Sequence, residues 1–248
     1  MAMIKTPEQI ARMREAGMIL ASCHEALASY IRPGVTTSEI DRYVEEFLAK
    51  RDATPEQKGY QGYPYATCAS VNDVICHGFP SSYELQDGDI IKVDMVVNRN
   101  GWLADSAWCY AVGAITDEVQ RLLDVTKQSL YLGIEQAVVG NHLGDIGHAI
   151  QSYAEPQGFS VVRDFAGHGI GQKLHEQPII PHYGRPGTGM LLREGMCLTI
   201  EPMLNMGTYK AKVDGDGWTA RTLDGRWSAQ YEHTVAITKD GPVILTTL

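Results

Sequence analysis

Three acidic residues lie at the ends of, or within, apolar stretches that have the composition of buried strands. Asp94 follows the letters IIKV, Glu201 follows MCLTI, and Glu232 lies inside AQYEHTV. A buried carboxylate is costly unless a positive group meets it. Few lysine or arginine residues stand near these acids in the sequence, whereas a divalent cation would compensate all three. The three positions therefore indicate a metal site.

A fourth acid is predicted to lie beside Asp94 on a β-hairpin. Asp94 and Asp105 flank Asn100-Gly101, a dipeptide typical of the type I′ turn. With a two-residue loop, Val96 lies opposite Asp105, and Asp94 shares the face of Val96 because side chains alternate along a strand. The two carboxylates are then diagonal neighbours with Cβ atoms roughly 7 Å apart, close enough to hold one ion. The alternative is a solvent-facing hairpin on which two acids coincide.

An imidazole completes the candidate ligand set. His168 lies in the glycine-rich stretch 167–171, where the backbone can approach a ligand closely. Four carboxylates and one imidazole suit Mn²⁺, Fe²⁺ or Co²⁺, with Zn²⁺ as a further candidate. So many acids suggest two ions, ~3.5–4 Å apart and bridged by shared carboxylates. The same glycines could cradle a nucleotide, but no helix opens directly after them, as a dinucleotide fingerprint requires.

The other histidines and Cys76 have simpler explanations. Packing or surface positions are expected for His24, His142, His148, His182 and His233. Cys76, beside His77, could act as a thiol nucleophile. Cysteine also packs as a small hydrophobe, and the carboxylates already supply a mechanism, so packing is favoured.

An internal repeat predicts how the chain brings these distant residues together. A Gly-x4-acid-Ile motif and an H-x-x-P motif, the latter at His77 and His175, occur once in each half. A Leu-x-x-Gly-x5-acid motif also occurs once in each half, where its acid is Asp94 in the first half and Glu201 in the second. Repetition in the same order is typical of a duplicated unit. A pseudo-two-fold axis would place Asp94 near Glu201, and likewise the two histidines near each other.

Helix and strand signals alternate along the chain. The sequence predicts helices over about residues 7–31, 37–50, 116–139 and 143–155, and strands over about 90–97 and 102–112. The first helix opens with Thr6-Pro7, a cap followed by proline at the first helical position. Since no linker or low-complexity tract divides the chain, we expect one α+β domain over residues 1–248, with halves of about 6–112 and 113–248.

The composition of the chain limits which binding partners and which cellular compartment are expected. The 248 residues carry a formal net charge of −9, which argues against nucleic-acid or anionic-membrane partners because both require lysine and arginine clusters. No apolar run is long enough to span a membrane, and the N-terminus lacks a signal core. The 5 cysteines are odd in number and none forms C-x-x-C. A reducing cytoplasm is therefore expected.

Five stretches together resemble the type I methionine aminopeptidases, metallohydrolases of the pita-bread fold. These are VNDVICHGFP, IIKVDMVVNRNGWLADSAW, FAGHGIG, LTIEPM and QYEHTVAIT. The likeness covers nearly the whole chain. It implies an α+β pita-bread fold in which two pseudo-symmetric halves form a curved antiparallel sheet backed by helices. The chain is similar to the short bacterial form without an N-terminal zinc-binding extension, and the short stretch from Glu201 to Glu232 excludes the helical insertion of type II relatives.

The resemblance implies a set of metal-binding and catalytic residues. The implied ligands of two divalent ions are Asp94, Asp105, His168, Glu201 and Glu232. Asp105 and Glu232 would bridge the ions. Glu201 would move a proton from the attacking water to the leaving nitrogen. His175 would donate to the substrate carbonyl oxygen, and His77 would position the amide beyond the scissile bond.

The resemblance also implies a methionine pocket and a monovalent-cation site. The implied substrate-binding residues are Tyr60, Tyr63, Cys68, His77, Leu174, His175 and Trp218. The implied ligands of one Na⁺ or K⁺ ion are the backbone carbonyls of Asn72, Val74 and Ser228. Two residues depart from the family pattern. Leu174 replaces a common aromatic, which widens the pocket, and Val96 replaces a threonine, which removes a hydrogen bond near the metals.

The implied reaction is removal of an N-terminal methionine from peptides and nascent chains with a small second residue. The implied protein is a cytoplasmic monomer whose partners are the N-termini of peptides and nascent chains, with the ribosome as a candidate partner that the sequence leaves open. One rival is a prolyl aminopeptidase or dipeptidase of the same fold, which usually carries an additional N-terminal domain. Another rival is a catalytically silent pita-bread protein that binds partners, but such proteins normally lose metal ligands.

Overall fold

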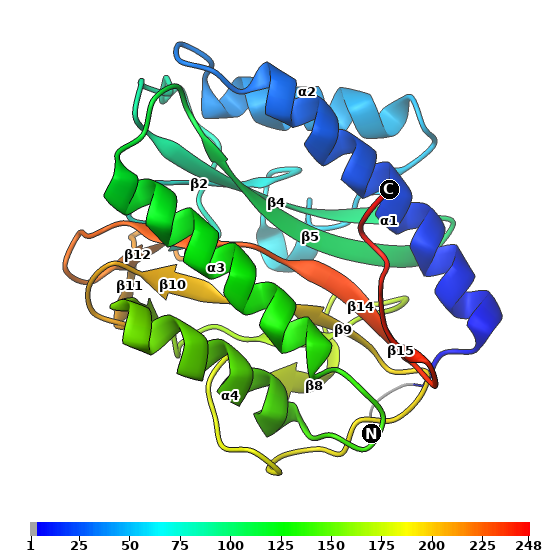
Figure 1. Ribbon diagram of the computed structural model, residues 1–248. Coiled ribbons are helices and arrows are strands. Elements are labelled where there is room, and N and C mark those ends of the chain that lie inside the picture. Colours follow the sequence, from blue (N-terminus) through cyan, green and yellow to red (C-terminus); the bar gives the residue numbers. More distant parts are fainter. Residues whose placement is uncertain (1–3) are drawn as a thin grey trace.

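The helices lie along one side of the strands, as the computed structural model of residues 4–248 shows (Figure 1). The helices are α1 (Pro7–Tyr30), α2 (Thr37–Ala49), α3 (Asp117–Glu135) and α4 (Leu143–Ala154), with short 3-10 turns η1 (Tyr60–Gly62) and η2 (Glu155–Gln157). Helix α1 packs on the strands Ile90–Arg99 (β4) and Trp102–Ala111 (β5) of the first half. Helix α3 packs on the strands Cys197–Ile200 (β9), Met203–Asn205 (β10) and Ser228–Gln230 (β13) of the second. No helix in residues 4–248 is long and apolar enough to cross a membrane.

The strands are mostly short and all pair antiparallel. They are β1 (Thr54–Pro55), β2 (Cys68–Val71), β3 (Val74–Cys76), β4 (Ile90–Arg99), β5 (Trp102–Ala111), β6 (Ser160–Val161), β7 (Gly167–Gly169), β8 (Glu176–Ile180), β9 (Cys197–Ile200), β10 (Met203–Asn205), β11 (Ala211–Val213), β12 (Ala220–Thr222), β13 (Ser228–Gln230), β14 (His233–Thr238) and β15 (Gly241–Ile244). Strands β1, β4, β2 and β5 form one sheet, and β15-β14-β9-β7-β8 forms another.

The β4–β5 hairpin has the predicted register. Arg99 pairs with Trp102 and Val96 pairs with Asp105. Asn100 and Gly101 both have positive φ, 53° and 79°, as a type I′ turn requires. The hairpin therefore presents Asp94 and Asp105 on one face.

Capping residues fix the starts of the helices. Thr6 and Gln9 form a capping box at α1, and Thr36 and Glu39 form another at α2. The predicted helix over 116–139 is too long, because α3 ends at Glu135. The chain there turns toward Gly140, whose φ of 96° is left-handed and cannot continue a helix.

Most of the helix packing is within each half. One cluster of buried side chains joins α1 and α2 to β4 and β5, and another joins α3 and α4 to β9 and β14. A third cluster joins Met13 of α1 to Leu103 and Ala236 across the halves.

The halves meet where β5 contacts β14. There the amide of Asp105 donates to Oγ1 of Thr234 (2.9 Å), and the amide of Glu232 donates to the carbonyl of Ala107 (2.8 Å). This junction brings acids from both halves together.

Candidate metal centre and its pocket

A cavity of about 660 Å³ lies where the two halves meet. Its lining includes every residue predicted to bind the divalent ions or the substrate, namely Asp94, Asp105, His168, Glu201, Glu232, Tyr60, Tyr63, Cys68, His77, Leu174, His175 and Trp218. The acids come from separate elements. Asp94 lies in β4 and Asp105 in β5, whereas Glu201 directly follows β9 and Glu232 directly precedes β14.

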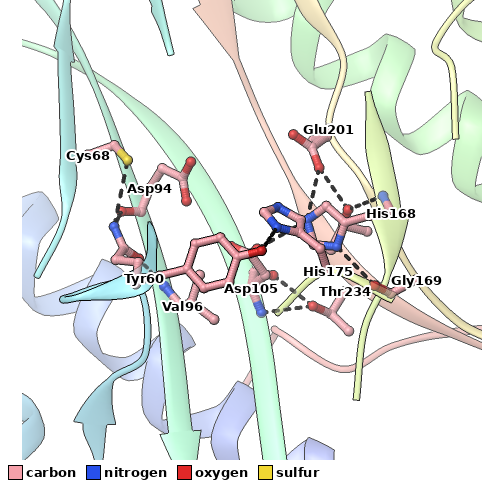
Figure 2. A network of polar contacts seen from close by, with 12 residues as sticks. Tyr60, Cys68, Asp94, Val96, Asp105, His168, Gly169, His175, Glu201 and Thr234 are labelled. Atoms are coloured by element: carbon pink, nitrogen blue, oxygen red, sulfur yellow. Dashed lines mark hydrogen bonds and ion pairs between the residues drawn. The ribbon is translucent and has the colours of Figure 1, made fainter. Parts of the chain in front are cut away.

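The candidate ligands face one another across the cavity. Figure 2 shows Asp94 and Asp105 on the hairpin opposite His168 and Glu201. Ligand atoms of Asp105, His168 and Glu232 all lie within 4.8 Å of one another. The Nε2 atom of His168 is 3.6 Å from Oδ2 of Asp105 and 3.8 Å from Oε1 of Glu201. These separations leave space for a cation between the side chains.

The electrostatics of the acids favour a cation. Burial raises the pKa of Asp94 to about 7 and that of Glu201 to about 8. Burial and the neighbouring carboxylates raise the pKa of Asp105 and of Glu232 well above the usual range. Within residues 4–248, Oδ1 of Asp105 and Oε1 of Glu232 are buried and have no hydrogen-bond partner. Divalent ions would satisfy both orphan oxygens and remove the cost of ionising the acids, so the donor set fits such ions.

His168 is prepared to ligate through Nε2. Its Nδ1 atom lies 3.0 Å from the carbonyl of Gly169, which can only accept, so Nδ1 carries the proton (Figure 2). Burial lowers the pKa of His168 to about 3, which keeps the ring neutral. The lone pair on Nε2 is therefore free to point at the acids, as a metal-binding imidazole requires.

Two residues that the sequence did not single out hold Glu201 in place. Oγ1 of Thr199 donates to Oε1 of Glu201 (2.7 Å) and accepts from the amide of His168 (2.9 Å). Nε2 of His182 accepts from the amide of Glu201 (3.0 Å). The expectation that His182 only packs in a loop was therefore incomplete. Its contact joins residues far apart in sequence, so the local pattern around His182 gave no signal.

Gln57 is a further residue that sequence reasoning missed. Its side-chain oxygen accepts from the amide of Val96 (2.6 Å), and its side-chain nitrogen donates to the carbonyl of Asp94 (3.2 Å). The side chain of Gln57 thus makes the backbone hydrogen bonds that a neighbouring strand would otherwise make, and it fixes the backbone around Asp94. Its position outside regular structure, between β1 and η1, hid this role.

Aromatic rings and a thiol form one wall of the cavity. The ring of Tyr63 packs edge-on against Trp218 (5.1 Å) and Phe79 (5.3 Å). Cys68 is buried beside them and lines the same cavity. The sequence did not identify Phe79, which lies two residues after His77.

Both H-x-x-P histidines lie beside the acids. The ring of His175 is 4.3 Å from that of His168, and its Nδ1 is 2.7 Å from the hydroxyl of Tyr60 (Figure 2). His77 has a φ of 56°, a conformation that is uncommon for residues other than glycine and is enriched at functional sites. The ring of His77 packs against Phe165 and Trp218.

Lys92 lies where the sequence predicts a monovalent cation. Its side chain is fully buried, and Nζ donates to the carbonyls of Asn72 (2.9 Å) and Ser228 (2.8 Å). Val74, the third predicted ligand, lies in β3. Lys92 stands two residues before Asp94, yet its ammonium contacts carbonyl oxygens and not the acids.

Comparisons with known proteins identify the family. A model of metallopeptidase family M24 matches residues 11–239. The methionine aminopeptidase of Clostridium perfringens is 52% identical over 246 residues, which are 99% of each chain. The crystal structure of methionine aminopeptidase from Rickettsia prowazekii matches with a TM-score of 0.98 and 43% identity, over 99% of this chain and 100% of that one.

A more distant structure shares only the fold. Prolidase from Pyrococcus furiosus matches with a TM-score of 0.78 and 22% identity, over 99% of this chain and 65% of that one. The expected α+β class and pita-bread fold are confirmed by these matches. The chain therefore belongs to metallopeptidase family M24 and, within it, to the methionine aminopeptidases.

Proposed function

We propose that this protein removes the N-terminal methionine from peptides and nascent proteins whose second residue is small. The observation that carries this proposal is the convergence of five candidate metal ligands from both halves on one cavity. The names of the similar proteins support the choice of methionine.

Two divalent ions are the proposed cofactors. Asp94, Asp105, His168, Glu201 and Glu232 would hold them, since all five side chains line the cavity and the ligand atoms of Asp105, His168 and Glu232 lie within 4.8 Å of one another. The oxygen-rich set suits Co²⁺, Mn²⁺ or Fe²⁺, with Zn²⁺ as a further candidate. When bound, such ions lower the pKa of water and polarise the scissile carbonyl.

The chain's own residues handle the protons of the reaction. Glu201 takes a proton from the attacking water and delivers it to the leaving nitrogen. The hydrogen bond from Thr199 orients the Glu201 carboxylate for both steps. His175 donates to the carbonyl oxygen as negative charge develops on it. His77 orients the amide beyond the scissile bond.

The aromatic wall is the proposed methionine subsite. Tyr63 and Trp218 offer ring edges and faces beside the buried thiol of Cys68. A thioether gains ~0.3–1.5 kcal/mol from each favourable sulfur–aromatic contact. Leu174 is buried and lines the same cavity, where we propose that it leaves a wider pocket than an aromatic ring would.

We also propose a cytoplasmic monomer that acts on nascent chains at the ribosome. All 5 cysteines are free and buried, as expected for a reducing compartment. The formal net charge of −9 argues against binding to nucleic acid by the protein itself.

The proposed activity is tested by comparing release of the first residue from Met-Ala-Ser and Ala-Pro-Ala, with and without a chelator. We expect methionine release that disappears with the chelator and returns with Co²⁺ or Mn²⁺. Hydrolysis of Ala-Pro-Ala alone would favour a prolyl peptidase. Binding without turnover under any metal would favour a silent relative, and either result would overturn the proposal.

A further inference from the structure

Lys92 ties together three segments that lead to the metal centre. It lies in β4, two residues before Asp94, and its side chain is fully buried. Its ammonium bonds to Asn72, in the turn between β2 and β3, and to Ser228, at the start of β13. Strand β3 leads to His77, and β13 leads to Glu232.

The surroundings of the ammonium are those of a cation site. Two carbonyl oxygens lie at 2.8 and 2.9 Å from Nζ, and no carboxylate among residues 4–248 forms an ion pair with it. A buried charge needs such oxygens to replace its lost hydration. The Asn72 carbonyl also accepts from the amide of Ser228 (3.0 Å), so the two segments are already locked together.

The same carbonyls cannot serve Na⁺ or K⁺ while Lys92 occupies them. The resemblance implied an alkali ion held by Asn72, Val74 and Ser228, but an ammonium already lies between two of these three residues. The chain therefore does not fit an alkali ion at this position.

We propose that the Lys92 ammonium is a built-in substitute for the monovalent cation, and that this protein holds its metal centre together without Na⁺ or K⁺. Lys92 is a positioning residue, because it acts through Asp94, His77 and Glu232. A covalently attached cation stays in place at any salt composition, whereas a bound ion follows its concentration.

The first test measures the unmodified protein in KCl, NaCl and choline chloride at equal ionic strength. We expect the same Tm in all three salts, both with EDTA and with Mn²⁺. The same kcat/KM is expected for the metal-loaded protein, and this arm alone rests on the proposed function. A saturable rise in Tm with K⁺ or Na⁺ would contradict the proposed role of Lys92.

The second test removes the ammonium. Lys92→Ala leaves a cavity lined by the two carbonyls, so we expect a lower Tm and about tenfold lower kcat/KM in choline chloride, a loss typical of residues that support metal ligands. K⁺ or Na⁺ should restore both quantities in a saturable manner. The Tm measured in EDTA reports this rescue independently of peptidase activity.

Two variants complete the design. Lys92→Met fills the same volume without charge, so we expect a lower Tm that no alkali ion restores. Lys58→Ala removes an exposed lysine that pairs with Glu45, and we expect no salt-specific effect. Absence of ion-specific rescue in folded Lys92→Ala would overturn the proposal, and if that variant does not fold, the salt dependence of the unmodified protein decides.

Discussion

The hydroxyl of Tyr60 gives His175 a defined protonation pattern. The hydroxyl of Tyr60 lies 2.7 Å from Nδ1 and accepts from the side-chain nitrogen of Gln61 (3.1 Å), which leaves its own proton available to Nδ1. With Tyr60 as the donor, the neutral ring carries its proton on Nε2. Burial lowers the pKa of His175, which favours this neutral form. The ring can then donate through Nε2 to a substrate carbonyl, which is the role proposed above.

Replacing the hydroxyl tests this arrangement. Tyr60→Phe removes one hydrogen bond, worth about 0.5–1.5 kcal/mol, and should lower kcat by about 2- to 12-fold with little change in KM. His175→Ala removes the donor itself and should cost about 10²- to 10³-fold in kcat on Met-Ala-Ser. Tyr209→Phe, on an exposed tyrosine, is the control. Unchanged kcat in His175→Ala would refute the assigned role.

The sequence alone was enough to find those site residues whose chemical type is unusual for their surroundings. Acids in apolar stretches and a histidine between glycines are unusual enough to be noticed, and all of them line the cavity. Thr199, His182 and Gln57 were missed because each contacts a segment outside its own stretch of sequence. The roles assigned to the individual site residues stay predictions until they are measured.

The β4–β5 hairpin shows how one element sets the geometry of the site. Its register was predictable because Asn100-Gly101 admits few alternatives, and a shift by one residue would turn Asp105 to the opposite face. The end of α3 and the very short strands were not predictable. Their limits depend on packing against segments far away in the sequence.

A substitution in the turn tests the hairpin. Gly101→Val forces a branched side chain into a φ of 79° and should lower the free energy of unfolding by about 1–2 kcal/mol. Activity per folded molecule should persist, because the turn is exposed. Gly215→Ala is a matched control, since a Cβ there meets no atom within 4 Å and its φ is ordinary. Equal unfolding midpoints in urea for both variants would contradict a type I′ turn.

At the scale of the whole molecule, the buried acids, which are costly to ionise, lie at the junction of two well-packed halves. Each half has a main cluster of buried side chains, a further cluster joins the two halves, and the acids lie at this junction. The pseudo-two-fold relation of the halves over about 6–112 and 113–248 stays a prediction. Stability should therefore depend on pH and on metal in a linked way.

The sign of that dependence follows from the raised pKa values. Above about pH 6.5, where the histidines of the unfolded chain have lost their protons, and up to the pKa values of about 7 for Asp94 and about 8 for Glu201, the folded metal-free protein holds more protons than the unfolded chain. Its stability should then fall as pH rises through this window. Thermal unfolding in EDTA from about pH 6.5 to 8 measures the effect, because the buried histidines act in the opposite direction below this range.

Added metal should reverse the loss of stability that the metal-free protein shows as pH rises. At a free Mn²⁺ concentration of 100 times Kd, binding contributes about 2.7 kcal/mol, which corresponds to a Tm increase of about 5–10 °C for a chain of this size. The increase should be larger at pH 8 than at pH 5, because the ligands must release protons to bind metal. A Tm that is independent of Mn²⁺ at pH 8 would contradict a metal centre at these acids.

The division of the candidate ligands between the two halves has a consequence for the folding of the protein during its synthesis. Asp94 and Asp105 are synthesised early, whereas Glu232 enters only with the last strands of the second half. A growing chain can pack its first sheet and still lack the residues that close the centre. A peptidase built in this way stays harmless to neighbouring nascent chains until its own folding is nearly finished.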